Sequence, residues 1–482
     1  MSSVKKNFAY QSIYQVANII LPLVTSPYVA RVLGAKGVGV YSYTYAIAYY
    51  FSLVALLGIA NHGNRIIAGV RDNKKKLTKT FSELLLVHCI IAFMAVVAYY
   101  IYFLFFVKED YMSAFIQGIW VLASFFDVSW FFFGLEKFKL TVTINLIVKF
   151  VTTICVFLFV HQPQDIWLYC LIMAAGSLFS QLALWPYIRQ YFNLRLVTWQ
   201  GMRTHIMPLL TLFIPAIAVS LYKYMDKIML GLLTTKAQVG FFENSERAIN
   251  IPISVIASFG TVMLPKMSNL VTKGDTERER HYIGLSMEFI MCLTSAMSFG
   301  IFAVAHNFAV VFWGDEFIAS GNLIQALSIS IIFVAFANII RMQYLIPKRL
   351  DVPYIISIFA GAVINLVTNA LLISRFAALG AAVGTAVAEF TVCAVQTFYV
   401  RKQLDIKQYI SKTLLFCAFG LLMATIVSLV GKFIPIRAVG LLMQIIVGAV
   451  VYSICSLFYF RKTQNKYIRT FIEKVGKRFL KS

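Results

Sequence analysis

Long hydrophobic runs with few polar interruptions fill most of the chain. An α-helix needs about 20 mostly apolar residues to cross a bilayer, because every backbone polar group in hydrocarbon must be bonded within its own segment. A β-barrel would show strictly alternating segments, and the run from Leu84 to Ala98 does not alternate. The pattern therefore predicts an all-α integral membrane protein with about 14 transmembrane helices. The predicted spans are 8–30, 40–60, 81–107, 113–134, 141–161, 166–186, 206–230, 249–271, 283–305, 322–342, 354–374, 377–400, 411–430 and 437–460.

Composition supports this prediction and explains the excess of basic residues. Of the 482 residues, 60% are hydrophobic and 13% charged, whereas soluble domains contain about 45–50% apolar residues. The net charge of +23 would suggest nucleic-acid binding in a soluble protein, but these bases form short clusters between apolar runs. We therefore expect the chain to contact the lipid bilayer and no nucleic acid.

The distribution of bases also predicts the orientation, because cytoplasmic loops carry the excess of Lys and Arg. With the N-terminus inside, the predicted cytoplasmic segments hold 32 bases and the external segments hold 8. Both termini are thus expected to be cytoplasmic in a multi-pass plasma-membrane protein. The first span lacks a small-residue cleavage site and is read as an uncleaved anchor. Residues 461–482 mix bases with apolar residues, which predicts a basic amphipathic cytoplasmic tail on the inner leaflet.

A short pattern recurs at the ends of the first and seventh spans. Arg31-Val-Leu-Gly34 leads to Val38-Gly-Val-Tyr41, and Lys227-Ile-Met-Leu-Gly231 leads to Val239-Gly-Phe-Phe242. Six spans separate the copies, so both copies run in the same direction, as in transporters built from parallel repeats. The domains predicted from this repeat are a six-helix bundle at 1–186, a cytoplasmic connector at 187–205, a second six-helix bundle at 206–400, helices 13 and 14 at 401–460, and the tail at 461–482.

Several motifs occur together in an order that resembles one transporter family. They are Ala30-Arg-Val-Leu-Gly34, Gly39-Val-Tyr41, Tyr50-Phe-Ser-Leu, Met225-Asp-Lys-Ile-Met-Leu-Gly231, Val262-Met-Leu-Pro-Lys-Met267, Phe312-Trp-Gly314 and Gly380-Ala-Ala-Val-Gly-Thr385 with Glu389. In this order, and with fourteen predicted spans, they resemble the polysaccharide-transporter branch of the multidrug/oligosaccharidyl-lipid/polysaccharide exporter superfamily. The resemblance covers nearly the whole chain.

The resemblance implies a Wzx-type flippase. Such a protein moves an undecaprenyl-pyrophosphate-linked oligosaccharide repeat unit from the inner to the outer leaflet of a bacterial plasma membrane, for O-antigen, capsule or exopolysaccharide synthesis. A polymerase and other polysaccharide-assembly proteins would be its partners, and we expect a monomer. Neither an enzymatic motif nor an ATP-binding motif occurs, so we expect no enzyme and no cofactor, with movement driven by a gradient or by the membrane potential.

Basic residues in or beside the spans are the candidate substrate-binding residues. A Lys or Arg at the bilayer centre costs about 2.5–3.5 kcal/mol on insertion scales and usually faces a cavity. A cationic vestibule would provide countercharge for a pyrophosphate stripped of its hydration. Lys149 lies deepest, and its own helix places no acid three or four residues away. A structural role is the alternative for each of the candidates, because helix-end bases can be solvated or paired and Lys149 could bond a backbone carbonyl. The candidates are Lys149, Arg31, Lys223, Lys227, Arg65, Arg247 and Arg341.

Three acids are candidate coupling residues: Asp127, Asp226 and Glu389. Each could be protonated, be paired with a base, or bind a coupling cation, and the pattern does not decide between H⁺ and Na⁺. For Asp226 the competing interpretation is an ion pair with Lys223.

Other functions share part of this pattern. A peptidoglycan-precursor lipid flippase, or a multidrug/cation antiporter of the same superfamily, fits the span count, although an antiporter would be expected to place acids rather than bases in its lumen. A membrane polysaccharide polymerase is the alternative from another class. The absence of a long external loop and of an Asp-x-Asp motif argues against it.

Overall fold

The computed structural model describes residues 3–435 and 437–463. Every regular element in these ranges is helical, and twelve of the helices are long and apolar enough to cross a membrane. Each of the fourteen predicted spans overlaps one of these twelve. The prediction of an all-α membrane protein is confirmed, whereas most of the predicted amphipathic tail lies outside the described residues.

The two numbers differ because two helices each contain a pair of predicted spans. Helix α1 (Ser3–Leu56) is interrupted at Gly34, whose φ of 67° lies in the left-handed region. Helix α13 (Asp351–Val400) is interrupted at Ala377, with a φ of 48°. Glycine has no Cβ and adopts positive φ readily, so the chain turns at Gly34 with little strain. The two predicted spans 8–30 and 40–60 are therefore joined by a tight connection at Gly34.

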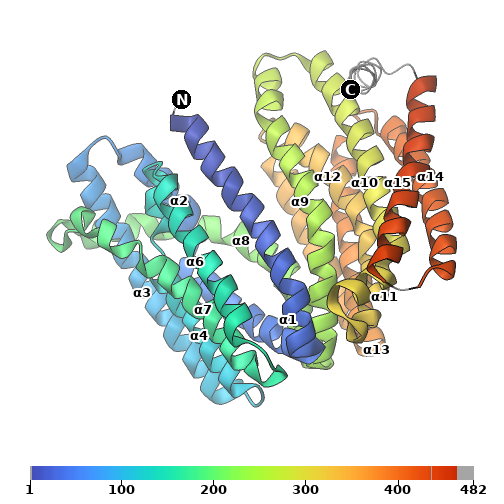
Figure 1. The fold of residues 1–482 in the computed structure, drawn as a ribbon. Helices are drawn as coiled ribbons and strands as arrows, with labels where there is room; N and C mark the ends of the chain where they lie inside the picture. The colour runs from blue at the N-terminus through green and yellow to red at the C-terminus, as the bar shows by residue number, and fades with distance from the viewer. Residues whose placement is uncertain (1–2, 436, 464–482) are drawn as a thin grey trace, which may run out of the picture. The chain divides into compact units, whose positions relative to one another are not determined.

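The chain folds as two compact units (Figure 1). The first unit is Met1–Asn244 with Asn369–Ala381, and the second is Ser245–Thr368 with Ala382–Ser482. The first unit includes the predicted connector at 187–205, whose residues form two short 3-10 turns, Arg189–Tyr191 and Leu194–Leu196, and the first turns of α8. The predicted bundles at 1–186 and 206–400 are defined by the sequence repeat rather than by this division, and they stay a prediction.

In the first unit, α4 packs against α1, α3 and α7, and α6 packs against α1 and α7. Aromatic side chains fill its core, where Phe81 and Trp130 are fully buried and Gly63 leaves room for the Trp130 indole. The remaining helices of this unit are α2 (Ile59–Val70), α3 (Lys74–Phe106), α4 (Tyr111–Phe125), α5 (Ser129–Gly134), α6 (Phe138–Phe159), α7 (Ile166–Leu182), α8 (Trp199–Leu233) and the start of α9 (Lys236–Thr272).

In the second unit, α10 packs against α11, α12, α14 and α15. The hydroxyl of Tyr452 donates a hydrogen bond of 2.7 Å to the carbonyl oxygen of Cys292, which joins α15 to α10. The helices of this unit, besides the rest of α9 and most of α13, are α10 (Thr276–Trp313), α11 (Ser320–Ser328), α12 (Ser330–Ile340), α14 (Ile406–Phe433) and α15 (Ala438–Lys462).

The repeated motif forms a reciprocal contact inside the first unit. A Cβ added to Gly39 would lie 1.6 Å from the carbonyl oxygen of Lys236, and one added to Gly240 would lie 2.0 Å from the carbonyl oxygen of Ala35. Each glycine thus faces the residue four positions before the equivalent glycine of the other copy. Such mutual contacts are typical of two-fold related surfaces. Backbone contact this close leaves no space for a side chain at either position.

Candidate functional site: a cluster of lysines, acids and tyrosines in the first unit

Helix α8 carries four residues of this cluster within two turns: Lys223, Tyr224, Asp226 and Lys227. The side chain of Thr198 accepts a hydrogen bond from the backbone N–H of Gly201 and so caps the start of this helix. Lys223 and Lys227 are four residues apart and share one face, as expected for an α-helix. Lys223 is exposed, whereas Lys227 is only 6% exposed. The two lysines therefore lie in different environments although they occupy the same face.

Lys227 forms a buried ion pair that the sequence did not predict. Its ammonium lies 2.6 Å from Oε2 of Glu243 on α9. The hydroxyl of Ser42 on α1 donates a hydrogen bond of 2.7 Å to the same oxygen. Buried charges are stable only when they are paired and hydrogen-bonded, and this arrangement supplies both requirements for the carboxylate. The network therefore joins three helices of the first unit around one carboxylate.

The neighbouring Asp226 has a different partner. It is 3% exposed, and the side-chain amide of Asn369 on α13 donates a hydrogen bond of 2.5 Å to its Oδ1. This contact joins α8 to the segment of α13 that belongs to the first unit. The adjacent residues Asp226 and Lys227 of α8 thus contact two different helices, α13 through Asn369 and α9 through Glu243.

Tyrosines surround the lysines of α8. The ring of Tyr49 stacks on that of Tyr224 with centroids 4.0 Å apart, and Tyr45 contacts Tyr224 edge-on at 6.1 Å. The ammonium groups of Lys223 and Lys227 lie 5.6 and 5.4 Å from the Tyr224 ring centroid, within the range of cation–π attraction. Most of the tyrosines on the second half of α1 therefore pack against α8, and the exposed Lys223 lies beside the Tyr224 ring.

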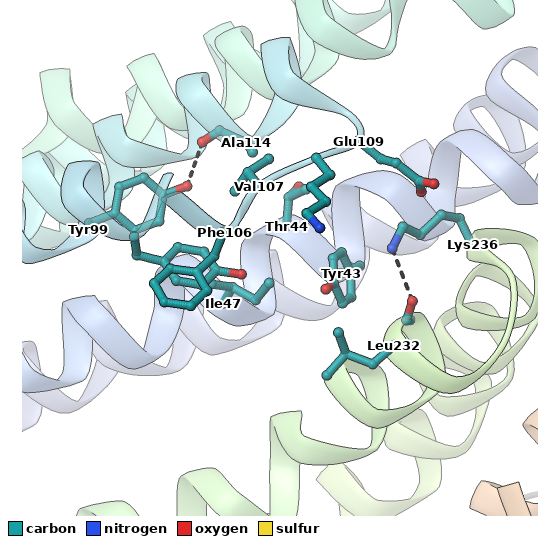
Figure 2. A pocket seen from close by; sticks show the side chains of 13 residues that line it. Tyr43, Thr44, Ile47, Tyr99, Phe106, Val107, Glu109, Ala114, Leu232 and Lys236 are labelled. Atoms are coloured by element: carbon teal, nitrogen blue, oxygen red, sulfur yellow. Dashed lines mark hydrogen bonds between the residues drawn. The ribbon is translucent and has the colours of Figure 1, made fainter. Parts of the chain in front are cut away.

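A small pocket lies farther along the same helices (Figure 2). Its volume is about 200 Å³, and its wall includes Tyr43, Tyr99, Glu109 and Lys236. The ammonium of Lys236 sits 3.5 Å above the Tyr43 ring and donates a hydrogen bond of 3.1 Å to the carbonyl oxygen of Gly231. Gly231 in turn lies directly against this ring. The Tyr43 ring is thus held between a cation and a backbone turn.

Charges of both signs gather beside this pocket. Burial raises the pKa of the Asp110 carboxyl above its usual range, and the nearby ammonium groups of Lys236 and Lys36 oppose that rise. Glu109 extends from the same loop between α3 and α4. The predicted outer end of the first unit therefore carries a mixed cluster rather than a purely cationic surface.

The remaining candidate residues of the first unit lie elsewhere in it. Lys149 is partly buried on α6 and donates a hydrogen bond to the side-chain oxygen of Asn18 on α1. Arg31 is exposed, three residues before the break at Gly34, and Arg65 is exposed on α2. Asp127 lies between α4 and α5, where it accepts hydrogen bonds of 2.8 and 2.6 Å from the backbone and hydroxyl of Ser129. Asp127 thus closes a local turn in this structure.

The second unit holds the other three candidates. Arg247 on α9 and Glu389 on α13 are partly buried. Arg341 begins a π-helical turn, Arg341–Leu345, and its guanidinium lies 5.7 Å from the ring centroid of Tyr354. Of the ten predicted site residues, the structure thus gathers Lys223, Asp226 and Lys227 in one cluster of the first unit.

Sequence reasoning missed Glu243, Ser42 and Asn369. A signal for the first two existed, because Ser42 and Glu243 each directly follow the repeated Val-Gly-x-aromatic motif. If the repeat is extended by one residue, Ser42 and Glu243 occupy equivalent positions in the two copies. No comparable pattern marks Asn369, whose contact with Asp226 depends on how its segment of α13 packs against α8.

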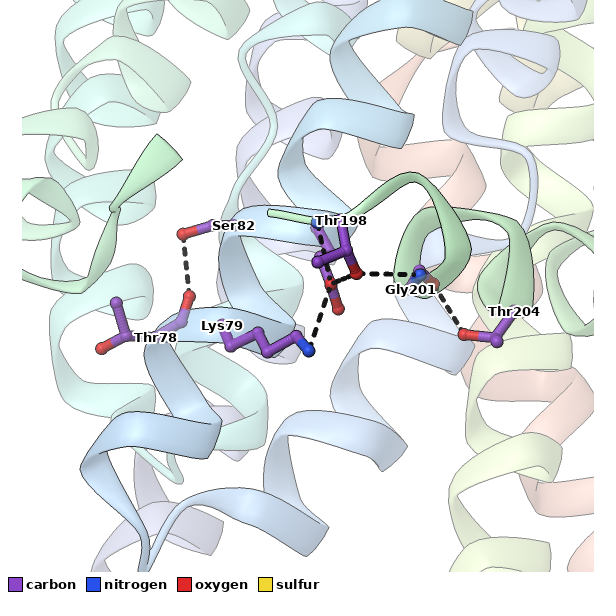
Figure 3. A network of polar contacts seen from close by, with 7 residues as sticks. Thr78, Lys79, Ser82, Thr198, Gly201 and Thr204 are labelled. Carbon is purple, nitrogen blue, oxygen red and sulfur yellow. Dashed lines mark hydrogen bonds and ion pairs between the residues drawn. The ribbon is translucent and has the colours of Figure 1, made fainter. Parts of the chain in front are cut away.

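A second polar network fixes the start of α8 (Figure 3). Oε1 of the buried Glu83 on α3 accepts hydrogen bonds from the hydroxyl of Thr198 at 2.9 Å and from its backbone N–H at 3.3 Å, and Lys79 lies 3.9 Å away. About two turns later, His205 hydrogen-bonds His62 of α2 at 3.2 Å. These contacts hold α8 against α2 and α3.

Comparison with known proteins decides the family. The family described as "Polysaccharide biosynthesis protein" matches residues 4–271, more than half of the chain. The chain belongs to this family. Its members are multi-pass membrane transporters and not enzymes. The resemblance to the polysaccharide-transporter branch is therefore confirmed.

Relatives in the polysaccharide biosynthesis protein family are distant in sequence. The chain is 22% identical over 383 residues to a "Putative O-antigen transporter" of Shigella dysenteriae, an alignment that covers 78% of this chain and 94% of the relative. It is 21% identical over 414 residues to a protein of the same name from Escherichia coli strain K12, which covers 83% of this chain and 97% of the relative.

The fold agrees with a solved transporter structure. The lipid II flippase MurJ in an inward closed conformation aligns with a TM-score of 0.74 at 17% identity, covering 95% of this chain and all of that one. At this identity the likeness shows a shared fold only.

Proposed function

We propose that this chain is a flippase that moves undecaprenyl-pyrophosphate-linked oligosaccharide repeat units from the inner to the outer leaflet of the bacterial plasma membrane by alternating access. The observation that carries the proposal is the group of lysines and tyrosines on α1 and α8 in a chain of the polysaccharide biosynthesis protein family. Ammonium groups provide countercharge for pyrophosphate, and aromatic faces suit sugar rings. The names of the two O-antigen transporter relatives agree with this substrate class.

In this proposal the basic residues bind the substrate in different ways. Lys223 is the exposed cation that meets the pyrophosphate first, and Lys149 contributes from α6. Lys227 is held by Glu243 until a substrate anion competes for it. Arg31, Arg65, Arg247 and Arg341 are proposed to attract the substrate at the ends of the spans.

The proposed architecture has two parallel six-helix bundles, at 1–186 and 206–400, and both termini in the cytoplasm. The reciprocal contact of Gly39 and Gly240 supports a two-fold relation between the copies. The excess of bases in alternate loops supports the orientation. Asp226, Asp127 and Glu389 stay the proposed coupling acids, with H⁺ or Na⁺ as the ion. A polymerase and other polysaccharide-assembly proteins would receive the exported unit.

Deletion of the gene tests the proposal. Lipid-linked repeat units should accumulate on the inner leaflet, and surface polysaccharide should be lost until the gene is supplied in trans. Normal surface polysaccharide in a deletion strain with no second flippase would refute the proposal. Accumulation of peptidoglycan precursor instead would assign the chain to the alternative lipid substrate, which the MurJ-like fold also accommodates.

A further inference from the structure

An apolar groove of about 690 Å³ lies in the second unit, between α12, α13 and α14. Its wall is built from phenylalanines and aliphatic residues, among them Phe333, Phe336, Phe390, Ile410 and Leu414. The volume falls in the range of about 300–1,000 Å³ typical of small-molecule sites. The groove belongs to neither the lysine cluster nor the pocket of the first unit, because all its lining residues lie in the second.

One end of the groove is cationic. Arg401 lines it directly after the last residue of α13, and its guanidinium lies 3.8 Å from the ring centroid of Phe398. Residues 401–412 hold four bases and one acid, Asp405. Lys412 in this segment already pairs with Glu288 of α10, whereas Arg401 is exposed at the mouth of the groove. An apolar groove with a guanidinium at one end is complementary to a hydrocarbon chain that carries a phosphate at its head.

The length of the groove indicates which kind of hydrocarbon chain it can hold. Along α14 its lining extends from Ile406 to Cys417, and along α13 from Phe390 to Arg401. Each stretch covers eleven residue steps, or about 16 Å at about 1.5 Å per residue. The hydrocarbon core of a bilayer is about 30 Å thick, so the groove spans roughly one leaflet. An acyl chain of a bilayer phospholipid fits this depth, whereas an eleven-isoprene chain would extend well beyond it.

We propose that this groove binds one anionic glycerophospholipid, with an acyl chain between α12, α13 and α14 and its phosphate on Arg401. Bases near an anionic surface contribute about 1 kcal/mol each, so the headgroup contact selects for negative charge. The site is independent of the proposed flippase activity, because it uses none of the residues assigned to the oligosaccharide substrate.

Native mass spectrometry of the purified full-length protein with phosphatidylglycerol tests this site. Wild type should retain one phosphatidylglycerol through delipidation, and should retain much less diacylglycerol with the same chains, which lacks the phosphate. Arg401→Ala should weaken retention about fivefold, as expected for one surface base. Lys402→Ala removes the same charge from the same segment without lining the groove, and should leave retention unchanged.

A groove-filling variant tests the position of the acyl chain. Ala394 lines the groove and is exposed, so Ala394→Trp should displace the chain while the protein keeps its wild-type elution and melting temperature. Equal losses for Arg401→Ala and Lys402→Ala would show nonspecific attraction and overturn the site, as would full retention by a folded Ala394→Trp protein. A polyprenyl lipid, bound only in cells that make the oligosaccharide, would also overturn it.

Discussion

Replacing Glu243 with glutamine removes the charge that neutralises Lys227 while keeping the size of the side chain. The two charged groups are 2.6 Å apart, and their side chains are 12% and 8% exposed. Breaking a buried ion pair by removing one partner costs about 3–5 kcal/mol, because the other charge stays buried without its counter-ion. We therefore expect Glu243→Gln to lower the free energy of unfolding by about 3 kcal/mol. Ser42→Ala removes only the hydrogen bond to the carboxylate and should cost about 1.5 kcal/mol.

A double-mutant cycle separates the ion pair from its surroundings. Lys227→Met removes the cation and keeps a long apolar side chain, so Lys227→Met combined with Glu243→Gln leaves no buried charge at either position. The double variant should recover most of the stability lost in Glu243→Gln, since the penalty comes from the lysine that loses this carboxylate. The free energy of unfolding would be measured by SDS titration of the purified protein in bicelles of fixed composition. If the losses in unfolding free energy of the two single variants add in the double variant, the broken ion pair is not the cause of the destabilisation.

Three further predictions concern packing, substrate binding and topology. Gly39→Ala should prevent stable folding because its Cβ would lie 1.6 Å from a backbone oxygen, whereas Gly69→Ala, with nothing within 4 Å, should leave thermal unfolding unchanged. Lys149→Ala should lose most export of lipid-linked units at normal membrane levels and Lys149→Arg should keep part of it; full complementation by Lys149→Ala would remove this lysine from the substrate site. Single cysteines placed in 230–248 should react with an impermeant reagent from outside and those in 266–282 only after permeabilisation, and the opposite pattern would reverse the orientation.

Local hydropathy was sufficient to predict the helical membrane fold. A run of about 20 apolar residues satisfies its own backbone in hydrocarbon only as a helix, so local composition is enough to predict each span. The repeated motif likewise predicted that residues near Gly39 and Gly240 play equivalent parts. Local spacing placed Lys223 and Lys227 on one face of the same helix, where the structure has them.

The partners of these residues depend on how the helices pack and could not be predicted from local sequence. Asp226 accepts a hydrogen bond from Asn369, and Lys227 pairs with Glu243, sixteen residues away. Hydropathy describes how each segment meets the bilayer, but not which helix packs beside it. Electrostatic and hydrogen-bond energies fall off steeply over a few ångströms, so a charge acquires its partner only when packing brings two helices together.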